Sequence, residues 1–334
     1  MLTQISGLSG SNSPDNHTRI LLRCIPPRKL LFDPVRDSYG SRLAISFGNE
    51  NREGSCPFYG HQCFHCDIGK GEGRFDISLN QDRLLYFEAH YGNALRNVEH
   101  LIVYNSGSAL NSNELSDETL KHILNYAKSL ENCKVISFDS REMYVIPSRL
   151  DLLIANLKAD QHPRAIIGIE TQSDDIRVKL LRKAMSKASI EKAFRTVSTY
   201  KARIGIDANV LFQPPGVWGQ TAIEEAVKTV SYLLELKERH NLSLDINFHP
   251  YYPSRIGISK FPNHPRANVE DAVAALIGIS DMLRRNSPDS QLFIGWQDEG
   301  YDTEQERRAD ELRVLMGKFN RFNISQDPTV LSST

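Results

Sequence analysis

The chain has 334 residues, of which 40% are hydrophobic, and its 40 Lys and Arg residues against 41 Asp and Glu residues give a formal net charge of −1. This balance argues against a general nucleic-acid binder, and no stretch approaches the roughly 20 apolar residues that span a bilayer. The N-terminus also lacks the basic and apolar regions of a secretory signal, so we expect a cytoplasmic protein with reduced thiols and no membrane contact.

Residues 1–18 are rich in Ser, Gly, Asn and Pro and predict a mobile tail. After them, short apolar runs alternate with amphipathic stretches. The apolar runs predict buried strands at 43–47, 101–104, 135–138, 165–169, 204–212 and 244–248. The amphipathic stretches predict helices at 117–130, 190–200 and 223–240, and Ser116 is expected to cap the first of these.

The C-terminal part continues with an apolar run at 291–296, a charged helix at about 303–318 and a tail at 323–334 that is expected to be frayed. Strands that alternate with helices pair in parallel through right-handed crossovers. Six such units predict an α/β protein, namely a partial (βα)6 TIM barrel at 41–265. An N-terminal extension at 1–40 would precede this barrel, and helices with one strand at 266–334 would follow it.

Three of the five cysteines, Cys56, Cys63 and Cys66, lie within eleven residues directly after the first predicted strand. Thiolates crowded on one loop repel one another unless a soft cation binds them, and this cation is either zinc or the iron of an iron–sulfur cluster. Zinc would need a fourth ligand such as His61 or His65. A cluster held by three cysteines instead leaves one iron open for a small molecule.

Two further observations bear on this choice. A disulfide with one free thiol is disfavoured because nothing else in the chain is typical of a secreted protein. In parallel barrels, catalytic groups gather at the C-terminal ends of the strands, which is where the cysteine loop begins. The position of the loop therefore favours an open catalytic cluster over structural zinc.

With this motif the chain resembles the radical S-adenosylmethionine (SAM) superfamily, and in particular the branch of the Elongator-type, methylthiotransferase and archaeosine-synthase enzymes. The first cysteine interval is longer than the usual one, Cys-x6-Cys in place of Cys-x3-Cys, whereas the second is the usual Cys-x2-Cys. The resemblance covers residues 40–255. It implies a [4Fe-4S] cluster on the three cysteines, SAM as a second cofactor, and an electron donor such as flavodoxin or ferredoxin.

The resemblance also implies where SAM is bound. The loop after the second strand, Tyr-Asn-Ser-Gly-Ser, lacks the acid that the superfamily has there. Phe64 or His65 would lie beside the adenine, and a cation at 182–183 would face the SAM carboxylate. The implied SAM contacts are Phe64, His65, Asn105, Ser106, Gly107, Ser108, Ser140, Glu170, Arg182, Lys183 and Asn209.

Strand alternation indicates which polar side chains line the interior of the barrel. Asp207, Asn209 and Gln213 share one face of their strand, and Asp245, Asn247 and His249 share one face of the next. Such residues are costly to bury unless they contact a ligand or one another, and both alternatives stay open. The expected substrate contacts are Asp139, Arg141, Gln213, Trp218, Asn247, His249 and Tyr251.

The sequence therefore predicts a radical SAM enzyme that cleaves SAM reductively to a 5′-deoxyadenosyl radical. Its substrate is expected to be a polar small molecule, such as a nucleoside or a sugar nucleotide, in specialised biosynthesis, and nucleic acid is the less favoured partner. The rival hypotheses are a tRNA-modifying enzyme of the same branch and a zinc-stapled binding protein without redox chemistry.

Overall fold

The computed structural model describes residues 35–51, 55–66, 75–251, 254–295 and 309–332, with only the backbone described at 88–91, 93–95 and 309–313. Its centre is an eight-stranded sheet in which the strands follow one another in the order of the sequence. Strands β2 to β8 pair in parallel, and β1 pairs antiparallel with β2. This arrangement confirms the predicted α/β class and the partial barrel.

The strands are β1 (Val35–Asp37), β2 (Gly40–Phe47), β3 (His100–Asn105), β4 (Val135–Ser140), β5 (His162–Glu170), β6 (Gly205–Phe212), β7 (Ser243–Pro250) and β8 (Leu292–Ile294). The α-helices are α2 (Ile77–Leu95), α3 (Asp117–Ser129), α4 (Pro147–Asn156), α5 (Lys187–Ser198), α6 (Gln220–His240), α7 (Arg255–Lys260), α8 (Val269–Asn286), α9 (Ala309–Ser325) and α10 (Thr329–Ser332). Short turns lie at η3 (Glu142–Tyr144), η4 (Asp175–Leu180) and η5 (Lys201–Arg203).

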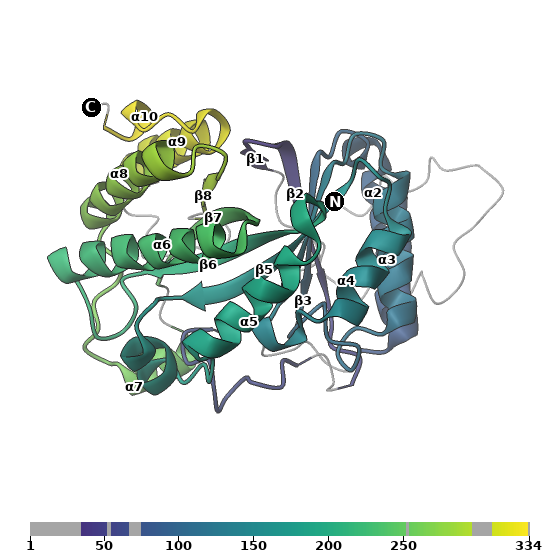
Figure 1. Ribbon diagram of the computed structural model, residues 1–334, viewed down its shortest axis with the longest axis horizontal. Helices are drawn as coiled ribbons and strands as arrows, with labels where there is room; N and C mark the ends of the chain where they lie inside the picture. The colour runs from purple at the N-terminus through teal and green to yellow at the C-terminus, as the bar shows by residue number, and fades with distance from the viewer. Residues whose placement is uncertain (1–34, 52–54, 67–74, 252–253, 296–308, 333–334) are drawn as a thin grey trace.

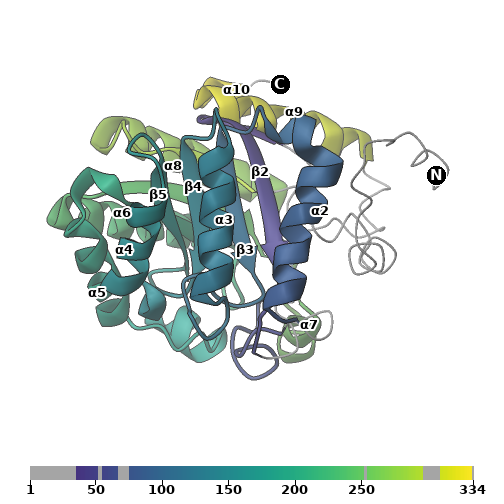
Figure 2. The ribbon, with the colours of Figure 1, turned by 90° about the vertical axis from the view of Figure 1, so that its right-hand side faces the viewer.

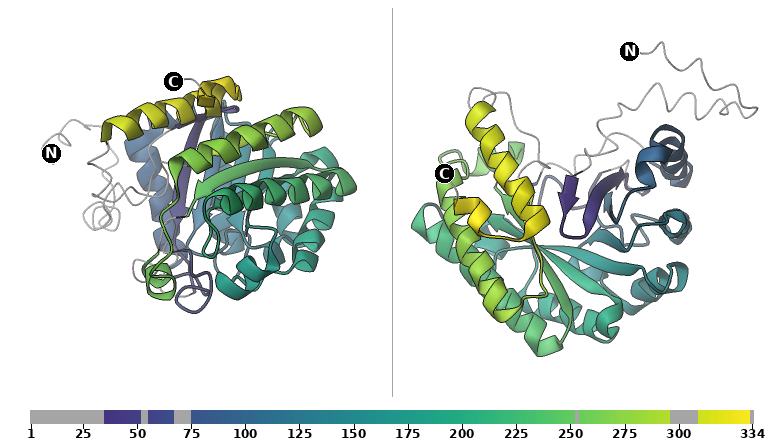
Figure 3. Two further views of the ribbon diagram at one scale, coloured as in Figure 1. Left: turned by 90° about the vertical axis from the view of Figure 1, so that its left-hand side faces the viewer. Right: turned by 90° about the horizontal axis from the view of Figure 1, so that it is seen from above.

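The sheet curves into an open barrel with the helices on its outer face (Figures 1 and 3). Helix α9 contacts both β1 and β8, the two edges that face each other across the opening. Helices α9 and α10 lie at one end of the barrel, and α7 lies at the opposite end, beside the loops that leave the strands (Figures 1 and 2). The C-terminal ends of the parallel strands therefore open toward α7.

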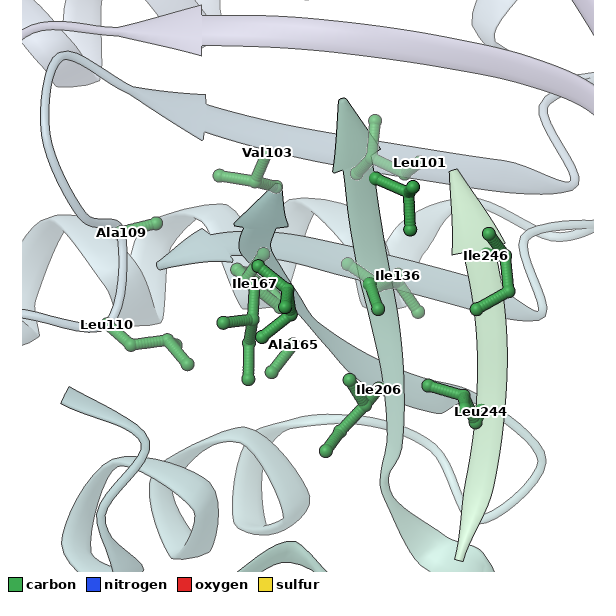
Figure 4. Packing of buried hydrophobic residues seen from close by; sticks show 14 of the residues in the cluster. Leu101, Val103, Ala109, Leu110, Ile136, Ala165, Ile167, Ile206, Leu244 and Ile246 are labelled. Atoms are coloured by element: carbon green, nitrogen blue, oxygen red, sulfur yellow. The ribbon is translucent and has the colours of Figure 1, made fainter. Parts of the chain in front are cut away.

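Alternate strand residues face the helices and form one apolar core. Figure 4 shows part of this core, with Leu101, Val103, Ile136, Ala165, Ile167, Ile206, Leu244 and Ile246 among the labelled side chains. Each of these side chains is at most 1% exposed. Because β-strand side chains alternate between the two faces, the remaining strand positions face the inside of the barrel.

The inside of the barrel holds a buried polar network near the N-terminal ends of the strands. The Ser137 hydroxyl of β4 donates a hydrogen bond to Asp207 of β6 (2.6 Å), and His100 Nε2 of β3 lies 2.9 Å from the same hydroxyl. Arg164 of β5 pairs with Asp207 (2.5 Å) and with Asp245 of β7 (2.9 Å). Two of these contacts, Ser137 with Asp207 and Arg164 with Asp245, join strands that are not neighbours, so they cross the interior of the barrel.

Several local predictions are confirmed. The Ser116 side chain accepts a hydrogen bond from the Thr119 amide (3.2 Å) and caps α3, whose first turn holds Asp117 and Glu118. All six predicted strands and the three predicted helices are present, with ends that differ by a few residues. Within the described ranges, no helix is long and apolar enough to cross a membrane.

The prediction of a frayed tail at 323–334 is wrong. Helix α9 continues to Ser325, and α10 follows it. The buried Asn323 side chain accepts a hydrogen bond from the Ile294 amide (2.7 Å) and donates one to the Ile294 carbonyl (3.1 Å), so this segment is anchored on β8. The predicted mobile tail at 1–18 and the start of the predicted helix at 303–308 lie outside the described residues.

Candidate active site

The cysteine loop follows β2 at the C-terminal end of the barrel. Cys56, Cys63 and Cys66 are partly exposed and form no disulfide. A backbone hydrogen bond from Cys66 N to Cys63 O (3.0 Å) forms a tight turn, and Cys63 adopts a positive φ of 52°. Within the described ranges, no three His, Cys, Asp or Glu side chains are close enough together to hold a metal ion. The loop nevertheless presents three cysteine thiols that are in no disulfide, which is the donor set that an open iron–sulfur cluster requires.

The loop is held over the ends of β5 and β7 by backbone contacts. Phe64 N donates to Leu181 O (3.0 Å), and Cys63 N donates to Arg182 O (3.4 Å). From the other side, the Ser254 hydroxyl that caps α7 donates to Phe64 O (2.6 Å). Segments separated by more than 100 residues thus fix the second cysteine in place.

A buried ion pair lies beside the cysteine loop at the end of β5. Glu170, with a φ of 66°, pairs with Lys183 Nζ (2.5 Å) and lies 3.3 Å from His65 Nε2. Burial alone would raise the pKa of Glu170, but Lys183 and His65 outweigh it and hold this pKa well below its usual range. Burial lowers the pKa of Lys183, yet Glu170 and then Cys63 raise it above its usual value. Both groups therefore stay charged.

Gly168 makes this ion pair possible. A Cβ atom at position 168 would lie 2.5 Å from both the Glu170 carboxylate oxygen and the Lys183 ammonium nitrogen. Such distances are far shorter than any contact that real Cβ atoms make, so a side chain here would displace the pair. Glycine at 168 thus leaves room for the ends of the Glu170 and Lys183 side chains close to the β5 backbone.

The loop after β3 contains an acid that the sequence did not reveal. Glu114, six residues beyond Ser108, turns back under the loop and accepts a hydrogen bond from Ser108 N (2.8 Å). Gly107 has a φ of 128°, and a Cβ atom there would lie 1.8 Å from the Glu114 carboxylate. Glu114 thus brings a buried carboxylate to a loop that has no acid at 104–108, and an acid a few residues beyond the strand is the signal that could have indicated it.

Unpaired polar atoms lie near this loop and the cysteine loop. Among the described residues, Asn49 Nδ2, Asn105 Oδ1 and His65 Nδ1 are buried and have no hydrogen-bond partner. Buried polar atoms without partners are unfavourable, and a bound polar ligand is one way to satisfy them. Asn105 ends β3, and Asn49 lies just past the end of β2. A ligand with both donors and acceptors, such as the amino acid part of SAM, suits these atoms.

Asp139 of β4 lies among the charges of this site. The pKa of Asp139 is raised to about 7. Burial is the largest cause of this increase, Glu114 and Glu170 add to it, and Lys183 opposes it. A carboxyl group with a pKa near neutrality can exchange a proton at physiological pH, which is a property that catalytic acids and bases share. Among the described carboxyl groups of this site with a stated pKa, Asp139 is therefore the one that titrates near neutrality.

We expect Asp139→Asn to change how stability depends on pH. The pKa of Asp139 in the folded chain, about 7, lies above its ordinary value of 3.8, so the unfolded chain releases this proton first as the pH rises. Between these two values the wild type loses up to about 1.4 kcal/mol of stability per pH unit through this group, whereas the variant does not. Urea unfolding at several pH values measures the difference. Equal pH dependence in both proteins would contradict the raised pKa.

The other predicted SAM contacts are distributed around the same end of the barrel. Arg182 is exposed, has a φ of 51°, and holds its guanidinium 5.8 Å from the Phe64 ring centre. Ser106 N bonds to Phe47 O (3.0 Å), and the Ser140 hydroxyl bonds to Arg141 O (3.0 Å). Phe64, His65, Asn105, Ser106, Gly107, Ser108, Ser140, Glu170, Arg182 and Lys183 thus all belong to loops or strand ends at this end of the barrel.

The polar side chains among the predicted substrate contacts form hydrogen bonds with different partners. Asn247 Nδ2 donates to Asn209 Oδ1 (3.0 Å), so these two amides bond to each other inside the barrel. The Gln213 amide donates to the carbonyls of Pro265 (3.0 Å) and Arg266 (2.7 Å), so it holds the 265–268 segment. His249 Nδ1 lies 3.3 Å from the Gly295 carbonyl.

The aromatic members of this set also differ. Tyr251 is 1% exposed and packs edge-on against His264, with the ring centres 5.3 Å apart. Trp218 is 59% exposed and contacts the same imidazole, with the ring centres 6.2 Å apart. Trp218 is thus the aromatic side chain of this set that is accessible to a partner.

Arg141, which the sequence suggests as a substrate contact, is turned toward the cysteine loop. One of its guanidinium nitrogens donates to Cys63 Sγ (3.8 Å), and the guanidinium carbon lies 4.0 Å from the centre of the Phe58 ring. The side chain is only 8% exposed. The structure therefore places Arg141 against the proposed cluster ligands.

Comparison with known proteins finds relatives whose sequences are only distantly similar to this chain. No family model matches the chain. The uncharacterized protein MJ0550 of Methanocaldococcus jannaschii is 22% identical over 236 residues, which cover 69% of this chain and 61% of the relative. The archaeosine synthase subunit beta of Thermococcus kodakarensis is 27% identical over 128 residues, which cover 38% of this chain and 39% of the relative. The chain thus spans less than two thirds of either relative.

Among solved structures, the chain is similar to SuiB of Streptococcus suis, with a TM-score of 0.50 and 9% identity. This match covers 75% of the chain and 49% of SuiB. At this level of identity the likeness shows the fold. The chain shares the partial-barrel fold of SuiB, and its sequence similarity to an archaeosine synthase subunit agrees with the resemblance that the cysteine motif suggests.

Proposed function

We propose that this chain is a radical SAM enzyme that holds a [4Fe-4S] cluster through Cys56, Cys63 and Cys66. One observation carries the proposal: three cysteine thiols that are in no disulfide lie on a loop whose backbone is pinned by hydrogen bonds over the C-terminal end of a parallel barrel. We expect the Cys56 and Cys66 side chains to turn toward Cys63 when the cluster binds. When bound and reduced by an electron donor such as flavodoxin or ferredoxin, the cluster would supply the electron for the reductive cleavage of SAM.

The residues of the chain would bind and orient SAM. The buried Asn105 Oδ1 can accept from an ammonium group, and the buried Asn49 Nδ2 can donate to a carboxylate. Lys183 neutralises Glu170 beside the cysteine loop, so their pair adds little net charge to the site. The Ser106–Ser108 loop, fixed by Glu114, would line the methionine part of SAM, with Phe64 or His65 beside the adenine.

A polar small molecule, such as a nucleoside or a sugar nucleotide, is the proposed substrate. Asn209 and Asn247 bond to each other across neighbouring strands and still have polar atoms that can contact a ligand. Asp139 lies near Lys183, Glu114 and Glu170 and can exchange a proton near neutral pH. These groups support a substrate that carries hydroxyl or amide groups.

Anaerobic reconstitution with iron and sulfide tests the proposal. We expect brown protein with a broad absorption at about 400 nm, and we expect 5′-deoxyadenosine to form when SAM and a strong reductant are added. Chromatography with mass detection measures the nucleoside. Colourless protein that retains one zinc ion would instead support a zinc-stapled binding protein and would overturn the cluster.

A tRNA substrate is the second candidate, because exposed basic side chains gather on the loops after β5 and β7. These side chains are Arg182, Lys187, Arg255, Lys260 and Arg266. Residues 176–190 and 254–269 contain no Asp or Glu. A gel shift with tRNA at several salt concentrations separates the two candidates, because binding through phosphates weakens steeply as salt rises.

A further inference from the structure

Arg141 lies where three separate loops meet. Its backbone N–H donates to the Ser108 hydroxyl (3.2 Å) in the loop after β3. One of its guanidinium nitrogens donates to the Lys183 carbonyl in the loop after β5, and the other donates to Cys63 Sγ (3.8 Å). The residue itself follows β4 directly. A single side chain thus joins the cysteine loop to the strand ends around it.

The same guanidinium also holds the long first cysteine interval. Its central carbon lies 4.0 Å from the centre of the Phe58 ring, in the stacked arrangement that favours a cation–π interaction. Phe58 belongs to the Pro57–Gln62 segment, which is longer than the usual interval between the first two cysteines. Two further hydrogen bonds, from Tyr59 N to Cys56 O (3.1 Å) and from Gln62 N to Phe58 O (2.9 Å), fold this segment on itself. Arg141 therefore connects the folded segment to the barrel.

The charge of Arg141 is only partly offset by its neighbours. Glu142 Oε2 lies 3.8 Å from Arg141 Nε, which is an ion-pair distance, yet neither of these two atoms has a hydrogen-bond partner among the described residues. The N–H that faces Cys63 Sγ is therefore not diverted to a carboxylate. Hydrogen bonds to cluster sulfurs and nearby positive charge favour the reduced state of an iron–sulfur centre, because reduction adds negative charge.

We propose that Arg141 is a positioning residue that holds the long first cysteine interval against the barrel and donates an N–H to Cys63, which raises the reduction potential of the cluster. The inference rests on the proposed function, since it concerns the residues that would surround the cluster. It gives the long interval a role: Phe58 supplies the ring on which the guanidinium is held in place. Arg141 would then act through the cluster ligands and would not bind the substrate.

Redox titration of the reconstituted protein, followed by electron paramagnetic resonance without SAM, tests this role. We expect Arg141→Gln to load the same amount of iron as the wild type. Its equilibrium constant for reduction should fall about tenfold, which corresponds to a midpoint about 59 mV lower for a one-electron couple. Arg239→Gln is the matched control, because it removes the same charge from the exposed end of α6, and it should leave the midpoint unchanged.

Two further variants separate charge from packing. Arg141→Lys keeps the charge but loses the planar contact with Phe58, so its midpoint should stay near that of the wild type while amide hydrogen exchange in 56–63 becomes several-fold faster. Phe58→Leu should speed exchange in the same segment. If Arg141→Gln does not load iron, Arg141→Lys and Phe58→Leu test the inference instead. Amide hydrogen exchange in 56–63 that is as slow as in the wild type in both variants would overturn it.

An unchanged midpoint in a loaded Arg141→Gln protein would also overturn it. This failure is distinct from a failure of the proposed function. If the wild type binds no cluster, the proposed function is wrong, whereas a loaded wild type with a midpoint that is insensitive to Arg141 removes only the role of Arg141.

Discussion

Cys63→Ala is expected to abolish both iron binding and SAM cleavage, and Cys56→Ala and Cys66→Ala are expected to do the same. A cluster with an open iron has three protein ligands, and removing one leaves a second iron without its thiolate. The iron content, the absorption at about 400 nm and the yield of 5′-deoxyadenosine measure the loss. Cys63 is the most informative of the three, because its loop is pinned by Leu181, Arg182 and Ser254 and should keep its fold without the thiol.

Cys133→Ala is the matched control for these variants. Cys133 is 1% exposed, and its thiol donates to the Val135 carbonyl (3.5 Å) at the start of β4, the end of the barrel away from the cysteine loop. The variant should lose some packing but keep its iron and its activity. Full SAM cleavage in any of the three loop variants would refute the assignment of the cluster ligands.

Arg164→Met is expected to lower the free energy of unfolding by about 3–5 kcal/mol, because it leaves Asp207 and Asp245 buried without their cation. Urea unfolding at neutral pH measures this loss. The unpaired carboxyl groups should have raised pKa values in the folded variant, so the deficit should shrink as the pH falls and they take up protons. A deficit that does not depend on pH would show that packing, and not charge, is lost.

Lys134→Met is the control for this prediction. Lys134 pairs with Asp160 on the surface, where both side chains are more than half exposed, so the pair is screened by water. Its removal should cost less than about 1 kcal/mol. If Lys134→Met lowered the free energy of unfolding as much as Arg164→Met does, burial would not be what makes the loss of an ion pair costly.

The sequence alone predicted much of the architecture, because the relevant signals are local. The apolar runs at 101–104 and 135–138 became β3 and β4, and the polar Ser116 followed by two acids became the cap of α3. The alternation of polar residues on β6 and β7 also indicated an interior face, and Asp207 and Asp245 do belong to the network that crosses the barrel. The frayed tail was predicted wrongly, because the anchoring of Asn323 on β8 has no local signal.

The candidate site was only partly predictable. The cysteine spacing and the polar strand ends are visible in the chain, but the partners of these residues are far away in sequence. Glu114 reaches its place only because the loop after β3 folds back on itself. Arg141 was expected to contact the substrate, and the fold brings it against Cys63 and Phe58, about 80 residues earlier in the chain.

By itself, the sequence determined the chemistry available to this protein: three thiols on one loop, and strands whose pattern of side chains requires a parallel barrel. The tertiary structure alone decided which charges meet, namely Glu170 with Lys183 and His65, Arg164 with two buried carboxylates, and Arg141 with the cysteine loop. The reason is physical. Strand and helix patterns arise from neighbours a few residues apart, whereas burial and ion pairing depend on groups that only the closed fold brings together.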